Sequence, residues 1–144
     1  MPRTSADLAQ SQSLTLAGAR RVLDAALAKA EDMQLRFCIV VADQTGDPIV
    51  SVRMDGAPRL SAGIAANKAY TVAGFGGMPT ASWWDAIKDE PALAQGITHT
   101  PRLIVFGGGV GVFDDGQLVG TIGVSGGTAD EDAEVAAAGA ATFS

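Results

Sequence analysis

Residues 103–143 read LIVFGGGVGVFDDGQLVGTIGVSGGTADEDAEVAAAGAATF, and this stretch decides the fold. Its apolar runs are separated by glycines and turn residues, and they predict three strands, at Leu103–Phe106, Val110–Phe113 and Leu118–Val124. Asp114–Gln117 joins the last two strands as a tight hairpin, because an Asp-Gly pair tolerates the positive φ angles of such a turn. The stretch therefore predicts antiparallel strands that lead into a final helix.

The junction between the last strand and the final helix has two interpretations. Thr128 and Glu131 have the spacing of a capping box, which marks the start of the helix. The backbone N–H groups of Gly126 and Gly127 are available to hold a small anion at this start. The alternative is a tight turn followed by a capped helix. It is favoured because the acidic residues of the first turns already complement the helix dipole and would repel an anion.

The segments before this stretch complete an α+β pattern. They alternate helical spacing with short apolar runs, as follows: a helix from Thr15 to about residue 31, strands at Phe37–Ala42 and Ile49–Met54, a helix at Ser61–Phe75 and a short helix at Thr80–Lys88. The whole order predicts a five-stranded, mainly antiparallel sheet flanked by helices. We expect residues 14–144 to form one domain and residues 1–13 to form a flexible N-terminal segment.

Composition excludes several classes of function. The net charge of −6 argues against a nucleic-acid partner, whose phosphates require a basic surface. No apolar run approaches the length of a membrane span, which needs about 18 residues or more, and the first residues lack the apolar core of a secretory signal. Cys38 is the only cysteine, so no internal disulfide forms, and its apolar neighbours indicate a buried, unreactive thiol. These features predict a cytoplasmic protein without a membrane partner.

Three charged residues are candidates for chemistry. Arg53 is suited to grip a carboxylate, and Asp55 or a desolvated Lys68 is suited to exchange a proton with a carbon acid. The backbone N–H groups of the glycine runs, at Gly107, Gly108 and Gly109 and at Gly126 and Gly127, are suited to stabilise an oxyanion. The plainer alternative is that Arg53 and Asp55 pair at a turn while Lys68 points into water. We expect the functional residues to surround one shared hollow.

Several segments together resemble the GlcG/HbpS-type family, which also occurs at the C-terminus of some corrinoid adenosyltransferases. The resemblance covers roughly residues 14–142 in unbroken order, and it is carried by LTLAGARRVLDAALAKAE, VVADQTGDPI, RMDGAP, SAGIAANKAYTVAGF and FGGGVGVFDDGQLVGTIGVSGGTADEDAEVAAAG. It implies a profilin-like fold and assembly into homo-oligomers, either dimers or larger rings. Members have been described as haem-binding, haem-degrading or redox-sensing proteins, so the resemblance implies haem as a cofactor.

Haem requires an apolar slot, an axial ligand and cations for its propionates. His99 is the only histidine and a candidate ligand, although a single loop histidine is more often solvated. Trp83 and Trp84 are adjacent and must point in different directions on a helix, one into a core and the other toward a pocket or interface. No cluster of histidines and cysteines predicts a metal site held by protein ligands alone.

Two functions follow from these observations. The first is an oligomeric small-ligand-binding protein that takes haem or another flat or acidic molecule. Its ligand-binding residues are predicted to be Arg53, Trp83, His99, Gly107, Gly108, Gly109, Gly126 and Gly127. The second is a cofactor-independent isomerase or lyase of small-molecule catabolism. In that case Arg53 is the anion clamp, and Asp55 or Lys68 is the catalytic residue that transfers a proton.

Overall fold

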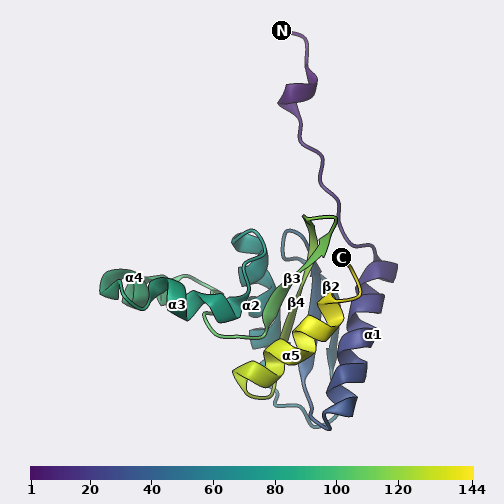
Figure 1. Ribbon diagram of the computed structural model, residues 1–144, viewed down its shortest axis with the longest axis vertical. Helices are drawn as coiled ribbons and strands as arrows, with labels where there is room; N and C mark the ends of the chain where they lie inside the picture. Colours follow the sequence, from purple (N-terminus) through teal and green to yellow (C-terminus); the bar gives the residue numbers. More distant parts are fainter.

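The computed structural model describes residues 1–144 and contains a central antiparallel sheet between two layers of helices (Figure 1). The sheet has four strands in the order β2-β1-β4-β3. Their bounds are Cys38–Asp43 for β1, Pro48–Arg53 for β2, Gly109–Asp114 for β3 and Gln117–Ser125 for β4. Cys38 pairs with Arg53 on one side and with Ser125 on the other. The last residues of β2 and β4 therefore lie beside the first residue of β1, at one end of the strands.

Different helices cover the two faces of the sheet. Helices α1 (Leu16–Asp32) and α5 (Ala129–Ala140) pack on one face, and α2 (Ser61–Gly74) packs on the other (Figure 1). Alternate residues of β1 supply both cores because successive strand side chains point to opposite faces. Ile39 and Val41 belong to the larger core under α1 and α5, whereas Cys38, Val40 and Ala42 meet the alanines of α2.

The predicted helix caps and hairpin are confirmed. The Thr15 side chain accepts a hydrogen bond from the backbone N–H of Gly18 at 3.1 Å. At the start of α5, Thr128 and Glu131 form both hydrogen bonds of the capping box. Asp115 and Gly116 take positive φ angles of 49° and 77° in the turn between β3 and β4. Local sequence signals were sufficient here because each contact spans only a few residues.

The prediction of five strands is wrong, because residues 103–106 do not join the sheet, which has four strands. The backbone N–H of Ile104 donates instead to the Thr71 hydroxyl of α2 at 3.0 Å. That hydroxyl also donates to the carbonyl oxygen of Arg102 at 3.1 Å. The apolar run Leu103–Val105 is half-buried as a strap along α2, so its pattern signals burial and not strand pairing.

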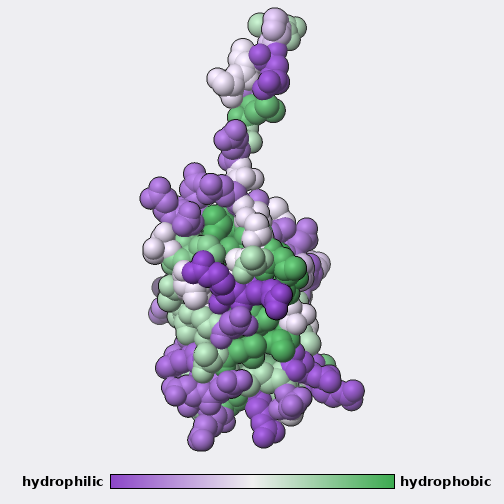
Figure 2. Space-filling model, turned by 90° about the vertical axis from the view of Figure 1, so that its right-hand side faces the viewer, coloured by the Kyte–Doolittle hydropathy of each residue, from purple (hydrophilic) through white to green (hydrophobic).

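Two segments project from the body of the molecule. An arm of short helices follows α2; it consists of η2 (Thr80–Ser82), α3 (Trp83–Ile87), α4 (Pro91–Gly96) and η3 (Ile97–His99) (Figure 1). Residues 1–13 are exposed and extend away from the body with a single turn, η1 (Ser5–Asp7) (Figures 1 and 2). The face that carries α1 shows hydrophobic residues between hydrophilic ones (Figure 2). None of the helices combines the length and apolar character that crossing a bilayer requires.

Candidate functional site

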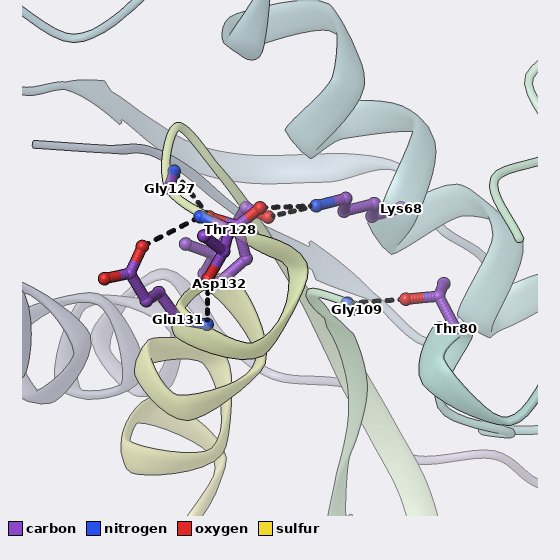
Figure 3. A network of polar contacts seen from close by, with 8 residues as sticks. Lys68, Thr80, Gly109, Gly127, Thr128, Glu131 and Asp132 are labelled. Carbon is purple, nitrogen blue, oxygen red and sulfur yellow. Dashed lines mark hydrogen bonds and ion pairs between the residues drawn. The ribbon is translucent and has the colours of Figure 1, made fainter. Parts of the chain in front are cut away.

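A buried ion pair connects α2, β4 and α5 (Figure 3). The side chain of Lys68 is completely buried, and its Nζ donates to Asp132 Oδ2 at 2.9 Å and to the carbonyl oxygen of Val124 at 2.8 Å. The other carboxylate oxygen of Asp132, Oδ1, accepts from the backbone N–H of Gly127 at 2.9 Å. Lys68 therefore connects α2 with β4 and α5 through contacts to residues that lie 56 and 64 positions further along the chain.

The alternative in which Lys68 points into water is wrong. Lys68 shares a buried stripe of α2 with Ala65, three residues before it, and Val72, four residues after it, and the adjacent Ala69 is also buried. This stripe faces the sheet, so Lys68 enters the interior with the alanines. Arg53 forms no ion pair with Asp55, because the ion pairs of the chain are Lys29–Glu134, Lys68–Asp132 and Lys88–Asp85.

Burial shifts the protonation of both partners toward their neutral forms. Desolvation lowers the pKa of Lys68 below its ordinary value of 10.5, and the hydrogen bond and charge of Asp132 oppose this shift. Desolvation also raises the pKa of Asp132, against the hydrogen bonds from Lys68 and Gly127. The two shifts bring the ammonium–carboxylate pair closer in energy to a neutral amine–acid pair, which differs from it by one proton moved along a 2.9 Å hydrogen bond.

The first glycine run packs directly on this pair. Gly108 has a φ of +130°, and a Cβ built on it would lie 2.5 Å from Lys68 Nζ and 2.5 Å from the Val124 carbonyl oxygen. Gly109 donates its backbone N–H to the Thr80 hydroxyl at 2.9 Å (Figure 3). Gly107 lies against the backbone of Ala129 at the start of α5. These glycines bring backbone close to Lys68, a role that no larger residue fits.

The second glycine run forms a tight turn. The N–H of Gly127 is bonded to Asp132, and the N–H of Thr128 is bonded to Glu131. Gly126 has a φ of +141° and packs against the backbone of Arg36 and Phe37. Since the N–H groups of Gly127 and Thr128 already have carboxylate partners, the junction has the features of the capped turn and not of an anion site.

Arg53 and Asp55 lie elsewhere, in the wall of the largest cavity, which measures about 660 Å³. The cavity lies where the end of α1 and the loop after it face the end of β2. Its lining residues are Leu27, Glu31, Gln34, Leu35, Arg36, Val52, Arg53, Met54, Asp55 and Gly56. Neither Lys68 nor any of the five candidate glycines lines this cavity. The structure thus divides the predicted shared hollow into two places, an open cavity with Arg53 and a closed cluster with Lys68.

A smaller cavity of about 230 Å³ lies on the α2 face of β2 and also includes Arg53. Cys38 is among its lining residues and is buried, in agreement with the sequence-based expectation. Burial raises the pKa of the Cys38 thiol, and the positive charge of Arg53 opposes this shift. Arg53 therefore contributes to a cavity on each side of the edge strand.

The two remaining candidate residues, Trp83 and His99, belong to the arm of short helices and lie outside the Arg53 cavity and the Lys68 cluster. Trp83 is 3% exposed and packs edge-on against Phe75, with ring centroids 4.5 Å apart, whereas Trp84 is 58% exposed. This contrast agrees with the prediction that the adjacent rings point in different directions. His99 is exposed in η3. Neither Trp83 nor His99 lines either of the two cavities that include Arg53.

Comparison with known proteins places this geometry in a family. Residues 14–141 match the family described as haem degrading protein HbpS-like. The chain belongs to the HbpS-like family. It is similar to the HbpS of Streptomyces reticuli, in the crystal structure of a double mutant, with a TM-score of 0.83 and 31% identity over 100% of this chain and 96% of that one.

Two further similarities concern PduO. The solved PduOC–haem complex has a TM-score of 0.83 and 27% identity over 91% of this chain and 95% of that chain. The corrinoid adenosyltransferase PduO of Citrobacter freundii is 31% identical over 93% of this chain, but the match spans only 40% of that enzyme. The relationship with both HbpS and PduO, which the sequence motifs indicated, is therefore confirmed.

Sequence reasoning missed Asp132 and Arg36. Asp132 looks like one of several acidic residues at the start of α5, yet Val135 and Ala136 lie three and four residues after it and are fully buried. This helical spacing places Asp132 on the buried stripe and is a signal that was available. Arg36 shares the large cavity with Arg53 because β1 and β2 are antiparallel, and only the sheet register brings these two arginines together.

Proposed function

We propose that this protein binds a flat, acidic small molecule in the Arg53 cavity, and that haem is the first candidate for that molecule. One observation carries the proposal: a cavity of about 660 Å³ combines Arg36 and Arg53 with an apolar wall. Its size lies within the range of roughly 300–1,000 Å³ that small-molecule sites occupy. Two guanidinium groups are suited to carboxylates because each donates a pair of parallel hydrogen bonds.

The residues of the cavity fit the requirements of haem. The apolar wall is formed by Leu27, Leu35, Val52 and Met54. Arg36 and Arg53 supply cations for the propionates, and the thioether of Met54 is of the axial-ligand type. That sulfur accepts a hydrogen bond from the backbone N–H of Phe37 at 3.4 Å, which holds it in place. The family description and the haem complex of PduOC support the same ligand.

Haemin titration of purified protein tests this proposal. We expect a saturable shift of the Soret band, and we expect Arg53→Ala to weaken binding by about tenfold or more, since a hydrogen bond to a charged group contributes roughly 1.5–3 kcal/mol. Arg53 is on the wall of the cavity and forms no ion pair within the chain, so its removal leaves the fold intact. The measurement is the dissociation constant from absorbance.

The matched control is His99→Ala, which removes the exposed imidazole of the arm. We expect no change in the Soret shift, because His99 does not line the cavity. Loss of binding in His99→Ala with full binding in Arg53→Ala would move the site to the arm and overturn the assignment. Binding that rises without saturation would remove haem as the ligand.

A second candidate function is supported by the position of Asp55. Arg53 and Asp55 line the same cavity, so an acid held by Arg53 lies within the same space as a carboxylate base. This arrangement is suited to a cofactor-independent isomerase or lyase in which Asp55 moves a proton at carbon. Lys68, the other residue considered for this step, is outside the cavity. Exchange of solvent deuterium into a bound acid distinguishes this function from binding alone.

We also propose that the protein forms a homo-oligomer. Helix α2 and the segments that follow it expose the aromatic rings of Tyr70, Phe75, Trp84 and Phe106. Exposed apolar surface of this kind marks interaction sites, and β2 adds an open sheet edge. We expect sedimentation velocity to give an assembly larger than the 14.6 kDa chain and Trp84→Ser to shift it to a smaller species. A wild-type monomer at micromolar concentration would contradict this proposal.

A further inference from the structure

Two glycines that are far apart in the sequence pack against Arg36, the second arginine of the Arg53 cavity. Gly56 lies in the turn after β2, and a Cβ built on it would overlap Arg36 Nη1 and lie 3.2 Å from Cδ and 3.3 Å from Cζ of that side chain. A Cβ on Gly126 would lie 2.6 Å from the Arg36 carbonyl oxygen and 3.0 Å from Phe37 Cα. One glycine therefore contacts the side chain of Arg36, and the other contacts its backbone.

We propose that Gly56 is a positioning residue of the Arg53 cavity. Its missing side chain leaves the space in which the guanidinium of Arg36 lies on the cavity wall, and this position of the guanidinium sets how tightly the cavity binds an anion. The inference rests on the proposed function, because it takes the Arg53 cavity as the ligand site. It goes further in assigning to Gly56 an effect on affinity that acts through Arg36.

The guanidinium of Arg36 is free to receive an anion. Glu31 and Asp55 line the same cavity, but neither forms an ion pair with Arg36, because the three ion pairs of the chain involve other residues. A guanidinium carries five N–H donors in a rigid fork that matches a carboxylate. An anion gains more from such a fork when its place is already set, since less side-chain freedom is lost on binding.

The backbone that carries Arg36 is held from two sides. On one side, the backbone N–H of Met54 donates to the Phe37 carbonyl oxygen at 3.0 Å, and the Phe37 N–H donates to the Met54 sulfur at 3.4 Å. On the other side, Gly126 closes against the Arg36 backbone from the junction of β4 and α5. An added Cβ at position 56 is therefore accommodated by rotation of the Arg36 side chain and not by movement of its backbone.

Gly56 also has a role in its own turn, and the two roles need separate tests. Its φ is +80°, and the Ala57 N–H donates across the turn to the Met54 carbonyl oxygen at 3.0 Å. Gly116 is a matched glycine in the turn between β3 and β4, with a φ of +77° and nothing within 4 Å of an added Cβ. Alanine at either position imposes similar backbone strain, but only Gly56→Ala displaces a neighbouring side chain.

A double-mutant cycle with haemin as the probe tests the proposal. We expect Arg36→Ala to raise the haemin dissociation constant about tenfold and Gly56→Ala to raise it about fivefold, because the displaced guanidinium keeps its charge but loses its hydrogen bonds to the ligand. In the Arg36→Ala background, Gly56→Ala should add less than about twofold, since the side chain through which it acts is gone. Gly116→Ala should leave the dissociation constant unchanged.

An equal effect of Gly56→Ala with and without Arg36 would overturn the proposal, because strain in the turn alone would then account for the loss of affinity. Gly56 is exposed at the surface, so the variant is expected to fold. Circular dichroism checks this for every variant.

A crystal structure of ligand-free Gly56→Ala gives a second readout that does not depend on haem. We expect the Arg36 guanidinium to have left its place over residue 56, with the backbone of residues 36–38 and 54–57 unchanged. A guanidinium that stays in place would overturn the positioning role. A wild type that shows no saturable haemin binding, together with a displaced Arg36 in the variant, would remove haem as the ligand and still support the role of Gly56.

Discussion

Asp132→Ala is expected to destabilise the protein by roughly 3–5 kcal/mol, because it leaves the ammonium of Lys68 buried without its counter-charge. In a domain of this size, such a loss lowers the thermal midpoint by roughly 10 °C or more. The remaining partner of Nζ, the Val124 carbonyl, satisfies only one of three donors. Urea unfolding followed by circular dichroism measures the change.

The pH dependence of the unfolding free energy tests whether Lys68 causes the destabilisation in Asp132→Ala. Asp132 raises the pKa of Lys68 through a hydrogen bond and a charge, so its removal lowers that pKa further below 10.5. Between the lowered pKa and 10.5, the unfolded chain binds a proton on Lys68 that the folded chain has released, and the free energy of unfolding therefore rises with pH. The difference in the free energy of unfolding between the wild type and the variant is expected to narrow as pH rises toward 10.5. A gap independent of pH would show that Lys68 is not the cause.

Gly123→Ala is expected to destabilise the protein by about 3 kcal/mol or more, at the upper end of overpacking effects. A Cβ on Gly123 would overlap the carbonyl oxygen of Ala65 and lie 2.8 Å from the backbone nitrogen of Ala69. Gly123 belongs to β4, an interior strand of the sheet, and the atoms it meets are helix backbone, so neither side can yield without moving α2. Urea unfolding gives the free energy.

Gly63→Ala is the matched substitution in α2. Nothing lies within 4 Å of the Cβ that it would add, and Gly63 is inside the helix. We expect it to stabilise the protein by about 0.5–1 kcal/mol, because alanine loses less conformational freedom in a helix than glycine. If Gly123→Ala were as well tolerated as Gly63→Ala, the close approach of α2 to the sheet would not be required for stability.

The site could be predicted from sequence only in part. Arg53 and Asp55 were chosen from a short turn motif, and both line the largest cavity. Arg36, which shares that cavity, is brought there by strand pairing, which leaves no local mark in the sequence. Lys68 was chosen as the one cation of its helix, but its partner Asp132 is 64 residues away. Contacts at that separation depend on how helices dock on the sheet.

The sequence by itself determined the principal helices, the hairpin between β3 and β4 and the family of this protein. Capping residues, Asp-Gly turns and apolar spacing act over a few residues, so their outcome needs no knowledge of the remaining chain. Tertiary structure decided the rest. It turned the apolar run 103–106 into a strap along α2, and it separated the Arg53 cavity from the Lys68 cluster. The physical reason is that an apolar pattern indicates which residues must be buried. The packing of distant segments decides which part of the protein buries them.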